Sequence, residues 1–292
     1  MESVTQVIAY GIVLGALYGL IALGLGLIMG ITKFLNIAHG TFIILGGYVS
    51  YWLFSLWGID PYLSIPLVII ATFLAGLILY KLTLSPLLKL PNIGMRIDSS
   101  LLITFGVIYV LDNAMTLVWT SNVRSIITSY TGEALTIFGA RLGINGLCGL
   151  GIAILAAVAL YFILSRTYFG KHVRAATQDA EAASLCGINV QRTYLISSGI
   201  AVALAGVAGV VIVSSYSITQ TSGLSWLLIG IVVMVLAGEG NINAILPAGI
   251  ILGLIESASI FVVGAPYRQA VALVIFIIVL MFRPQGLFTK RE

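Results

Sequence analysis

The chain alternates between long apolar runs and short polar interruptions. Apolar runs that cross or nearly cross the roughly 30 Å of bilayer hydrocarbon, which takes about 20 helical residues, occupy residues 4–31, 41–57, 62–80, 99–119, 143–164, 193–213, 244–263 and 267–282. Because only helices or closed barrels satisfy their backbone groups in lipid, this pattern predicts an all-α integral membrane protein. We expect a polytopic bundle of about 8–9 transmembrane helices with broken or re-entrant segments.

The expected number of spans is eight or nine because of the stretch after the sixth apolar run. Residues 214–223 are polar without charge, and residues 224–237 are apolar over only about 14 positions, which is short for a span. Gly238, Glu239, Gly240 and Asn241 then form a polar hinge. The segment before the hinge is a tilted span, a re-entrant segment or one half of a broken helix, and the sequence leaves these alternatives open.

Small residues recur at helical spacing on two of the predicted spans. Gly11, Gly15 and Gly19 lie four residues apart in the first span, and Ala201, Ala205 and Gly209 do so in the sixth. Such stripes let two membrane helices approach closely. We therefore interpret them as packing faces.

Composition excludes a soluble domain. Of 292 residues, 60% are hydrophobic and only 8% are charged, against about 25% charged in soluble domains. We interpret residues 1–292 as a single transmembrane domain. The two cysteines, Cys148 and Cys186, do not suggest a disulfide framework. The basic residues are scattered between apolar spans, so a nucleic-acid partner is not expected.

Basic residues predict the orientation in the membrane. With nine crossings, eleven Lys and Arg fall on one side and three on the other: Lys33, Lys81, Lys89, Arg96, Arg166, Lys171, Arg174, Arg192, Arg283, Lys290 and Arg291 against Arg124, Arg141 and Arg268. Positive charge concentrates on the cytoplasmic side. Residues 165–192 and the C-terminus are therefore expected in the cytoplasm and the N-terminus outside. Residues 81–98, with Pro86 and Pro91, are expected to be a cytoplasmic connection.

Catalytic chemistry finds little support in the sequence. Gly170-Lys171 lacks the glycine spacing and the following Ser or Thr of a phosphate-binding loop. His39 and His172 are far apart and have no cluster of supporting ligands, so neither a metal site nor a cofactor is expected. The chain is not expected to be an enzyme.

Polar groups at membrane depth are the candidates for a translocation pathway, because burying them unpaired is costly. Asn36, His39 and Gly40 interrupt the apolar pattern where a broken helix would expose backbone groups to a polar solute. The alternative is a structural kink. Glu256, in the middle of residues 244–263, either lines the pathway or makes an interhelical hydrogen bond. Asp112 and Asn113 are expected near the outer interface.

The longest polar break, residues 165–192, reads SRTYFGKHVRAATQDAEAASLCGINVQR. Ala, Gln, Glu and Arg favour a short helix, which Gly187 is placed to end. Val173, Ala176, Ala180 and Ala183 fall on one small-residue face, which we interpret as able to dock into a groove on another protein. The other reading is a solvated helical loop.

Within this break, Glu181-Ala182-Ala183 followed after three residues by Gly187 resembles the EAA loop of membrane subunits of bacterial ABC importers. The flanking sequence, with Leu35-Asn36-Ile37-Ala38-His39-Gly40 and Arg283-Pro284-Gln285-Gly286-Leu287-Phe288, is similar to permeases for branched-chain amino acids and their relatives for urea and amides. The three motifs bracket nearly the whole chain. A departure occurs at residues 236–243, where the family usually has a Gly-Gly-x-Gly-Ser-type turn.

The resemblance implies a permease subunit that forms half of a translocation pathway for branched-chain or other small amino acids. It implies a second homologous permease, two cytoplasmic ABC ATPases that hydrolyse ATP, an extracytoplasmic binding protein, and a place in the bacterial inner membrane. The implied ATPase-coupling residues are Arg174, Asp179, Glu181, Ala182, Ala183 and Gly187. Urea, an amide or an organic acid as solute, and a self-contained secondary transporter or channel, remain the alternatives.

Overall fold

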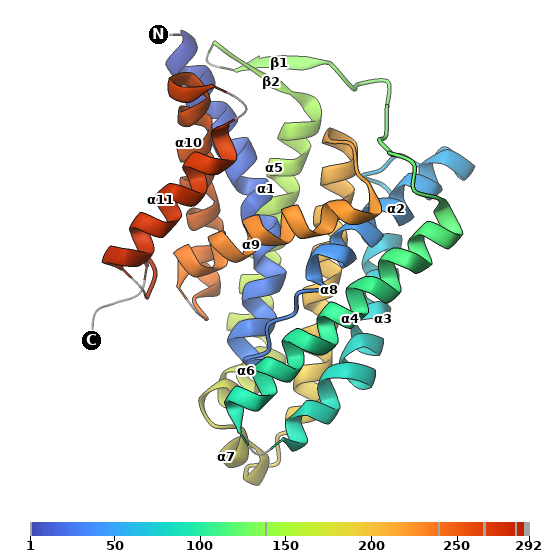
Figure 1. Ribbon diagram of the computed structural model, residues 1–292, viewed down its shortest axis with the longest axis vertical. Coiled ribbons are helices and arrows are strands. Elements are labelled where there is room, and N and C mark those ends of the chain that lie inside the picture. The colour runs from blue at the N-terminus through green and yellow to red at the C-terminus, as the bar shows by residue number, and fades with distance from the viewer. Residues whose placement is uncertain are drawn as a thin grey trace.

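The computed structural model describes residues 2–90, 92–137, 139–238, 240–264, 267–283 and 285–288. Glu239 of the predicted hinge, Pro91, Pro284, Lys290 and Arg291 lie outside these residues. The longer helices are α1 (Glu2–Thr32), α2 (His39–Trp57), α3 (Ile65–Leu79), α4 (Ile93–Trp119), α5 (Ile144–Arg166), α6 (Tyr168–Gln178), α7 (Ala180–Leu185), α8 (Val190–Ser215), α9 (Gly223–Ala237), α10 (Ile242–Val263) and α11 (Arg268–Phe282) (Figure 1).

The predicted all-α membrane architecture is confirmed. Eight helices of the described chain are long and apolar enough to cross a bilayer, and a shorter apolar helix covers Ala270–Phe282. The eighth span exists because a 3₁₀ turn, Gln220–Ser222, extends α9 to 18 residues, Gln220–Ala237. In Figure 1, α9 runs obliquely across the bundle. The segment whose nature the sequence left open is therefore one continuous helix, inclined to the long axis of the bundle.

Helices α1 and α8 form the centre of the bundle. In each, 83% of the most apolar window is buried by the rest of the chain, against 11% in α4 and 17% in α5. The core helices are packed by their small residues: Ala201 and Ala205 of α8 are almost completely buried, and Gly209 lies against Ile43 of α2. This confirms that the small-residue stripe of the sixth span is a packing face.

The most extensive contact between two helices is that of α1 with α10. A Cβ atom added at Gly15 would lie 2.5 Å from the Ile250 Cα atom and 2.6 Å from the Gly249 carbonyl oxygen. Gly11 and Gly19 meet α10 in the same way, at Leu254 and at Leu246. The backbones therefore touch along the whole stripe, as the four-residue spacing of the glycines predicts.

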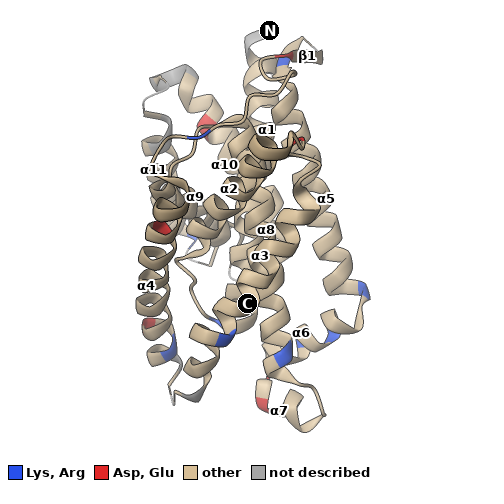
Figure 2. Ribbon diagram, turned by 90° about the vertical axis from the view of Figure 1, so that its right-hand side faces the viewer, with Lys and Arg blue, Asp and Glu red and all other residues tan. Residues whose placement is uncertain are grey.

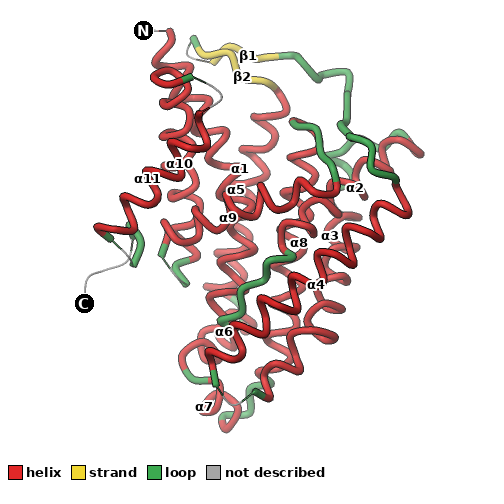
Figure 3. Tube along the Cα trace, in the orientation of Figure 1, coloured by secondary structure: helices red, strands yellow, loops and turns green. Residues whose placement is uncertain are grey.

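Helix α2 begins inside the bundle rather than at its edge. After α1 ends at Thr32, residues 33–38 run back between the helices as the loop seen at the centre of Figure 3. Phe34, Asn36 and Ala38 on this loop are fully or almost fully buried, whereas Lys33 is exposed. The interruption of the apolar pattern after the first span is thus a real break in the helical structure.

The connection between α3 and α4 is shorter than expected. A π-helical turn (Tyr80–Leu84) and a 3₁₀ turn (Ser85–Lys89) continue α3, so residues 81–98 are mostly helical rather than a loop. Pro86 does not break this extension, because it lies in the first two positions of the 3₁₀ turn, where its missing N–H group costs nothing. These turns form the connection between two spans that the sequence predicts, and its cytoplasmic side stays a prediction.

The two ends of the bundle differ. Short strands β1 (Ala134–Ile137) and β2 (Ala140–Gly143) pair antiparallel, with Ala134 opposite Gly143, in the region expected to be a polar loop. This hairpin lies at the end where α1 begins, and α6 and α7 lie at the opposite end (Figure 1). Basic positions cluster mainly toward the α6 and α7 end (Figure 2).

Candidate functional site

The polar break 165–192 folds into two helices, α6 and α7, instead of one. The backbone leaves helical geometry at Asp179, with φ −152° and ψ 109°. The Asp179 side chain accepts hydrogen bonds from the backbone N–H groups of Glu181 (2.9 Å) and Ala182 (3.0 Å). Asp179 is therefore the N-cap of α7. Its negative charge also interacts favourably with the positive N-terminal end of the helix dipole.

Gly187 ends α7 as the sequence predicts. Its φ of +83° is left-handed, a conformation that glycine adopts without a Cβ clash. The Gly187 N–H group donates to the Ser184 carbonyl, and the Ile188 N–H group donates to the Ala183 carbonyl, each at 3.0 Å. This pair of bonds is a Schellman motif, which fixes both the end of α7 and the direction of the chain into α8.

The small-residue face of this segment packs on the protein's own bundle. Val173, Ala176 and Ala183 are 5%, 3% and 5% exposed, and α6 contacts α5, α8 and α1. The prediction that this face docks on another protein is therefore wrong, because its apolar side chains are buried against helices of the same chain. The outward surface instead carries Glu181, Ala182 and Leu185, the last 90% exposed.

Leu185 is a residue that the sequence reasoning missed. Its exposed side chain places apolar area at the tip of a polar loop, where a partner protein can cover it. Its signal in the sequence was a single leucine among polar and small residues, two positions before the glycine that ends the helix. The tip of α7, defined here as Glu181, Ala182 and Leu185, is the outermost described part of that end of the molecule (Figure 1).

Helix α6 is fixed to the end of α5. The Arg174 guanidinium donates a hydrogen bond from Nη1 to the Leu164 carbonyl oxygen, and Thr167 Oγ1 donates to the Ile163 carbonyl at 2.5 Å. Gly170 lies directly against these carbonyl groups, so that a Cβ atom there would overlap Leu164. The carbonyl groups at the end of α5 thus accept hydrogen bonds from residues in the first turns of α6. These bonds hold the two helices in direct contact.

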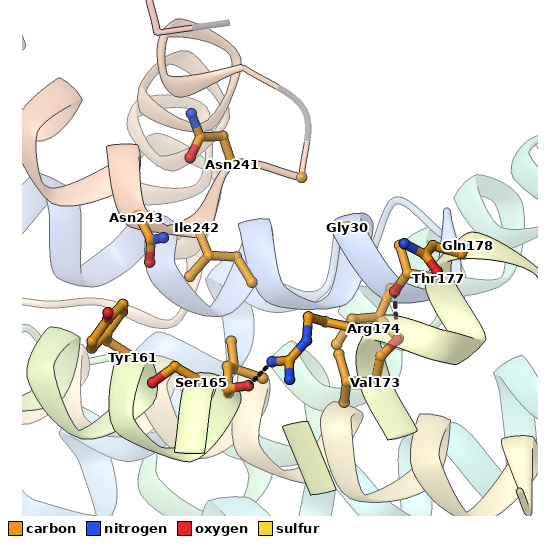
Figure 4. Close-up of a pocket in the computed structure, with 13 residues that line it drawn as sticks. Gly30, Tyr161, Ser165, Val173, Arg174, Thr177, Gln178, Asn241, Ile242 and Asn243 are labelled. Carbon is orange, nitrogen blue, oxygen red and sulfur yellow. Dashed lines mark hydrogen bonds between the residues drawn. The ribbon is translucent and has the colours of Figure 1, made fainter. Parts of the chain in front are cut away.

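A cavity of about 380 Å³ separates α6 from the turn before α10 (Figure 4). Arg174, Thr177 and Gln178 of α6 line one side, and Asn241 and Asn243 line the other. Figure 4 shows the Arg174 guanidinium directed toward the end of α5 beside Ser165, where it donates to the Leu164 carbonyl. Arg174, which the sequence predicts to couple to an ATPase, connects α6 to α5 beside this cavity and is exposed, and its contact with an ATPase stays a prediction.

The candidate pathway residues at the break between α1 and α2 are deeply buried. Asn36 and His39 are 0% exposed. His39 Nε2 lies 3.2 Å from the Ile21 carbonyl oxygen of α1 and donates to it, while His39 Nδ1 and both polar atoms of the Asn36 amide have no hydrogen-bond partner among the described residues. Buried polar groups are rarely left unpaired, so this position calls for an explanation beyond packing.

Gly40 brings the beginnings of two helices together. A Cβ atom at Gly40 would overlap the Gly223 carbonyl oxygen at the start of α9 and would lie 2.9 Å from the Leu227 Cβ atom. Helices α2 and α9 therefore both begin inside the bundle and next to one another. Only glycine permits this contact.

The structure places Glu256 away from the helix break. Glu256 is 2% exposed on α10, and the adjacent Ser257 hydroxyl donates to the Val7 carbonyl at 2.7 Å. His39 contacts α1 at Ile21. Fourteen residues separate Val7 from Ile21, about 21 Å along the helix. The residues expected to line one pathway thus lie at two depths.

Helix α4 carries a buried polar stripe that sequence reasoning did not single out. Ser100 and Thr104 are 0% exposed, and the Ile37 N–H group donates to Thr104 Oγ1 at 3.3 Å. Asp112, two turns further on, lies beside Thr41 of α2. The spacing of four and eight residues was the available signal. Asp112 is half-buried and Asn113 is exposed, and their place near the outer interface stays a prediction.

The loop between α4 and β1 is fixed to the turn between α2 and α3. The Tyr130 hydroxyl donates to Asp60 Oδ2 at 2.6 Å, and the Tyr62 and Tyr130 rings stack with centroids 6.3 Å apart. Burial, reinforced by the hydrogen bond to Asp60, raises the pKa of Tyr130 to about 12. The phenol therefore stays protonated and keeps donating at physiological pH.

In the described part of the chain, no three His, Cys, Asp or Glu side chains gather as a metal site. The polar groups of the described residues are instead distributed between the exposed tip of α7 at one end and buried positions along the bundle.

Comparison with known proteins identifies relatives over nearly the whole chain. The chain is 29% identical to the high-affinity branched-chain amino acid transport system permease protein BraD of Pseudomonas aeruginosa, over 98% of this chain and 96% of that protein. It is 32% identical to the probable branched-chain amino acid transport permease protein LivH of Methanocaldococcus jannaschii, over 92% and 87%. The ribose import permease protein RbsC of Haemophilus influenzae is 28% identical over 61% of this chain and 57% of its own.

No solved structure matches the chain. The sequence model of the family described as "Branched-chain amino acid transport system / permease component" matches residues 7–280. With a multi-pass helical fold and matches that extend over almost its full length, the chain belongs to the family of permease components of branched-chain amino acid ABC transport systems.

Proposed function

We propose that this permease forms half of a translocation pathway for branched-chain amino acids, driven by ATP hydrolysis in separate cytoplasmic subunits. A second, homologous permease supplies the other half, and an extracytoplasmic binding protein delivers the solute. The relatives' names support the choice of solute. Urea, amides and small organic acids are the alternatives within the same class of importer.

The observation that carries the proposal is the construction of the α6–α7 segment. Its buried face, Val173, Ala176 and Ala183, anchors it to the bundle, while Glu181, Ala182 and Leu185 face outward. Because Arg174 and Gly170 join α6 to α5, a push on the tip of α7 is transmitted to a membrane helix. An ATPase that closes against this tip biases the bundle between its two open states.

Asp179 and Gly187 define the beginning and the end of α7, and Ala183 packs α7 on the bundle. We therefore assign Glu181 and Ala182, with Leu185, to contact with the ATPase, and Arg174 to transmission. Asn36, His39 and Gly40 are assigned to the pathway at the helix break. Glu256 is assigned to a separate buried position on α10.

The placement of partners follows from charge and exposure. The basic positions near α6 and α7 (Figure 2) support a cytoplasmic location of that end, with the C-terminus on the same side, in a bacterial inner membrane. Helices α4 and α5 are largely uncovered by their own chain. These two helices are the surface available to a second permease and to lipid.

The test is co-purification of the ATPase with the permease in mild detergent, quantified by mass spectrometry. Leu185→Glu removes no internal packing, because the side chain is 90% exposed, and should reduce ATPase recovery by tenfold or more if the apolar tip is an interface anchor. Glu181→Arg should act in the same direction. Ile127→Glu, at a 74% exposed position in the loop between α4 and β1, is the matched control.

Unchanged ATPase recovery with both Leu185→Glu and Glu181→Arg would show that the α7 tip is not the docking surface. Uptake of labelled leucine by the full complex in vesicles, competed with valine, urea and acetamide, tests the solute. Competition by urea or acetamide, without competition by valine, would contradict the proposed substrate.

A further inference from the structure

Most of the unpaired buried polar atoms of the bundle gather along one line, the α2–α4 seam. We define this seam as the contact of α2 and the preceding loop, residues 33–38, with α4 and Arg124. Nine buried side-chain nitrogen and oxygen atoms of the described residues have no hydrogen-bond partner among these residues. Six of the nine belong to residues on or next to the seam: Asn36 (Nδ2 and Oδ1), Tyr48 (Oη), Trp52 (Nε1), Asp112 (Oδ1) and Arg124 (Nε). Buried polar groups normally find partners, so their concentration at one helix contact calls for an explanation.

The seam extends over most of the thickness of a membrane. Three contacts along it join Ile37 to Thr104 (N–H to Oγ1, 3.3 Å), Thr41 to Asp112, and Tyr48 to Trp119 (stacked rings, centroids 5.3 Å apart). Helices α2 and α4 therefore run side by side in the same direction. Fifteen residues separate the first from the last of these positions on α4, which is about 22 Å along the helix. The hydrocarbon core of a bilayer is roughly 30 Å thick.

Arg124 lies at the end of the seam. Its guanidinium donates from Nη2 to the Trp119 carbonyl oxygen and from Nη1 to the Tyr51 hydroxyl, each at 3.3 Å. Its Cζ atom lies 5.3 Å from the centroid of the Tyr51 ring and 5.8 Å from that of Trp52. Tyr48, Tyr51 and Trp52 share one face of α2, because they are spaced by three and four residues. The unpaired groups thus continue from the helix break to this arginine.

Helix α4 can separate from α2 at little cost. It is the least buried of the eight candidate spans, with 11% of its most apolar window covered, and it lies at the edge of the molecule in Figure 2. Ser100 and Thr104 are on its buried face, and their hydroxyl groups donate to carbonyl groups of α4 itself, each at 2.7 Å. Separation leaves these hydroxyl groups satisfied, and it opens Asn36, Tyr48 and Asp112 to new partners.

We propose that the solute crosses the membrane along the α2–α4 seam, which is closed in this structure, and that α4 moves away from α2 to admit it. In the open state, water and solute supply the partners that Asn36, Tyr48, Asp112 and Arg124 lack in the closed state. The seam begins at the helix break already assigned to the pathway and adds α4 as its movable wall. This inference rests on the proposed function, because it places the route of the transported solute.

A seam that only packed two helices would have a different composition. The packing faces of this protein are small, as where Gly15 of α1 meets Gly249 of α10 with touching backbones. The α2–α4 seam instead carries amide, carboxyl, phenol and guanidinium groups, and burying such groups without partners in a membrane is costly. A second conformation in which these groups gain partners explains why the chain retains them.

The experiment measures the reactivity of single cysteines in the complete transporter in lipid vesicles. Thr104→Cys and Ser100→Cys place a thiol where the native side chain is 0% exposed, in a background that carries Cys148→Ser and Cys186→Ser. The probe is a charged, water-soluble methanethiosulfonate on both sides of the membrane. Because the thiolate is the reacting form, modification reports water in the seam. Both thiols should react at least about tenfold faster during leucine-driven ATP hydrolysis than without nucleotide, since turnover populates a minor open state.

Two control cysteines separate opening of the seam from other effects. Leu102→Cys lies on the opposite face of α4, where the native side chain is 75% exposed, and should react at the same slow rate in both conditions because lipid or a second permease covers it. Ala248→Cys, at a 0% exposed position of α10, reports a general loosening of the bundle. As a second measurement, a short bifunctional methanethiosulfonate that joins Thr41→Cys to Asp112→Cys should abolish uptake, and a reductant should restore it.

Thr104→Cys and Ser100→Cys that react as slowly as Ala248→Cys during turnover would show that the seam stays closed and would overturn the proposal. Equally fast reaction with and without nucleotide would indicate permanent water instead of a gated route, and would overturn it as well. Uptake that continues after Thr41→Cys is joined to Asp112→Cys would have the same meaning. Wild-type leucine uptake and ATP hydrolysis in the same vesicles distinguish the two levels: if both are present, only the route fails, whereas their absence means that the proposed function fails.

Discussion

Asp179 accepts hydrogen bonds from the backbone of Ala182 and Glu181, so the residue that interrupts the polar segment also starts its second helix. The segment is therefore an angled pair of helices instead of one rod. Helix α6 packs on the bundle, and α7 carries the exposed tip. We therefore expect α6 to transmit motion to the membrane helices and α7 to contact the ATPase.

Loss of this cap should weaken α7. Asp179→Ala removes a side-chain acceptor at the N-terminus of the helix, which costs about 0.5–2 kcal/mol. We expect faster amide hydrogen exchange over residues 180–185 and weaker stimulation of the ATPase by solute. Asp179→Asn keeps the cap and should retain most of both; equal defects in the two variants would indicate a role of the charge instead.

Gly187 should tolerate only residues that adopt left-handed geometry. Gly187→Val places a β-branched residue at φ +83°, where L-residues pay about 1–2 kcal/mol. We expect the Schellman bonds to open and ATPase recovery to fall, as followed by co-purification. Gly187→Asn should be milder, and a valine variant with unchanged recovery would exclude this turn from the coupling surface.

Gly170 should be needed for transmission without being part of the ATPase contact. In Gly170→Ala the new methyl group meets the Leu164 and Ile163 carbonyls, so α6 must move away from α5. The ATPase should still bind, while leucine-stimulated ATP hydrolysis and uptake decrease together. Gly151→Ala, on α5 with nothing within 4 Å of the added atom, serves as control. A fully coupled Gly170→Ala variant would contradict this assignment.

The contact of α1 with α10 should be a main determinant of stability. Gly15→Ala forces two touching backbones apart, and overpacking of this kind typically costs about 1–3 kcal/mol. A lower Tm in detergent is expected, measured by thermal unfolding of the purified protein. Gly106→Ala, on the sparsely packed α4, should leave the Tm unchanged.

A substitution at Asn36 can test whether this residue lines the translocation pathway or stabilises a kink in the helix. Its amide is 0% exposed and lacks hydrogen-bond partners among the described residues, so replacing it with an apolar side chain of similar size should be neutral or stabilising. We expect Asn36→Leu to keep or raise the Tm while uptake in vesicles falls. A decrease in Tm with normal uptake per folded molecule would instead identify Asn36 as a structural residue.

The sequence determined the class, the spans and the positions of the breaks. Long apolar runs in lipid can only become helices, and the spacing of Gly11, Gly15 and Gly19 required a close neighbour. The helix end at Gly187 was also predictable, because a local left-handed turn depends on that residue alone. The family resemblance carried by residues 181–187 was borne out over most of the chain.

Only the tertiary structure decided which partner each face meets. The small residues at 173, 176 and 183 look the same in sequence whether they bury against their own bundle or against another protein, and the fold assigned them to the bundle. Likewise His39 and Glu256 are set at different depths only by where each helix meets α1. Hydrophobic periodicity reports how much of a surface is buried, and the partner that buries it depends on contacts between residues far apart in the chain.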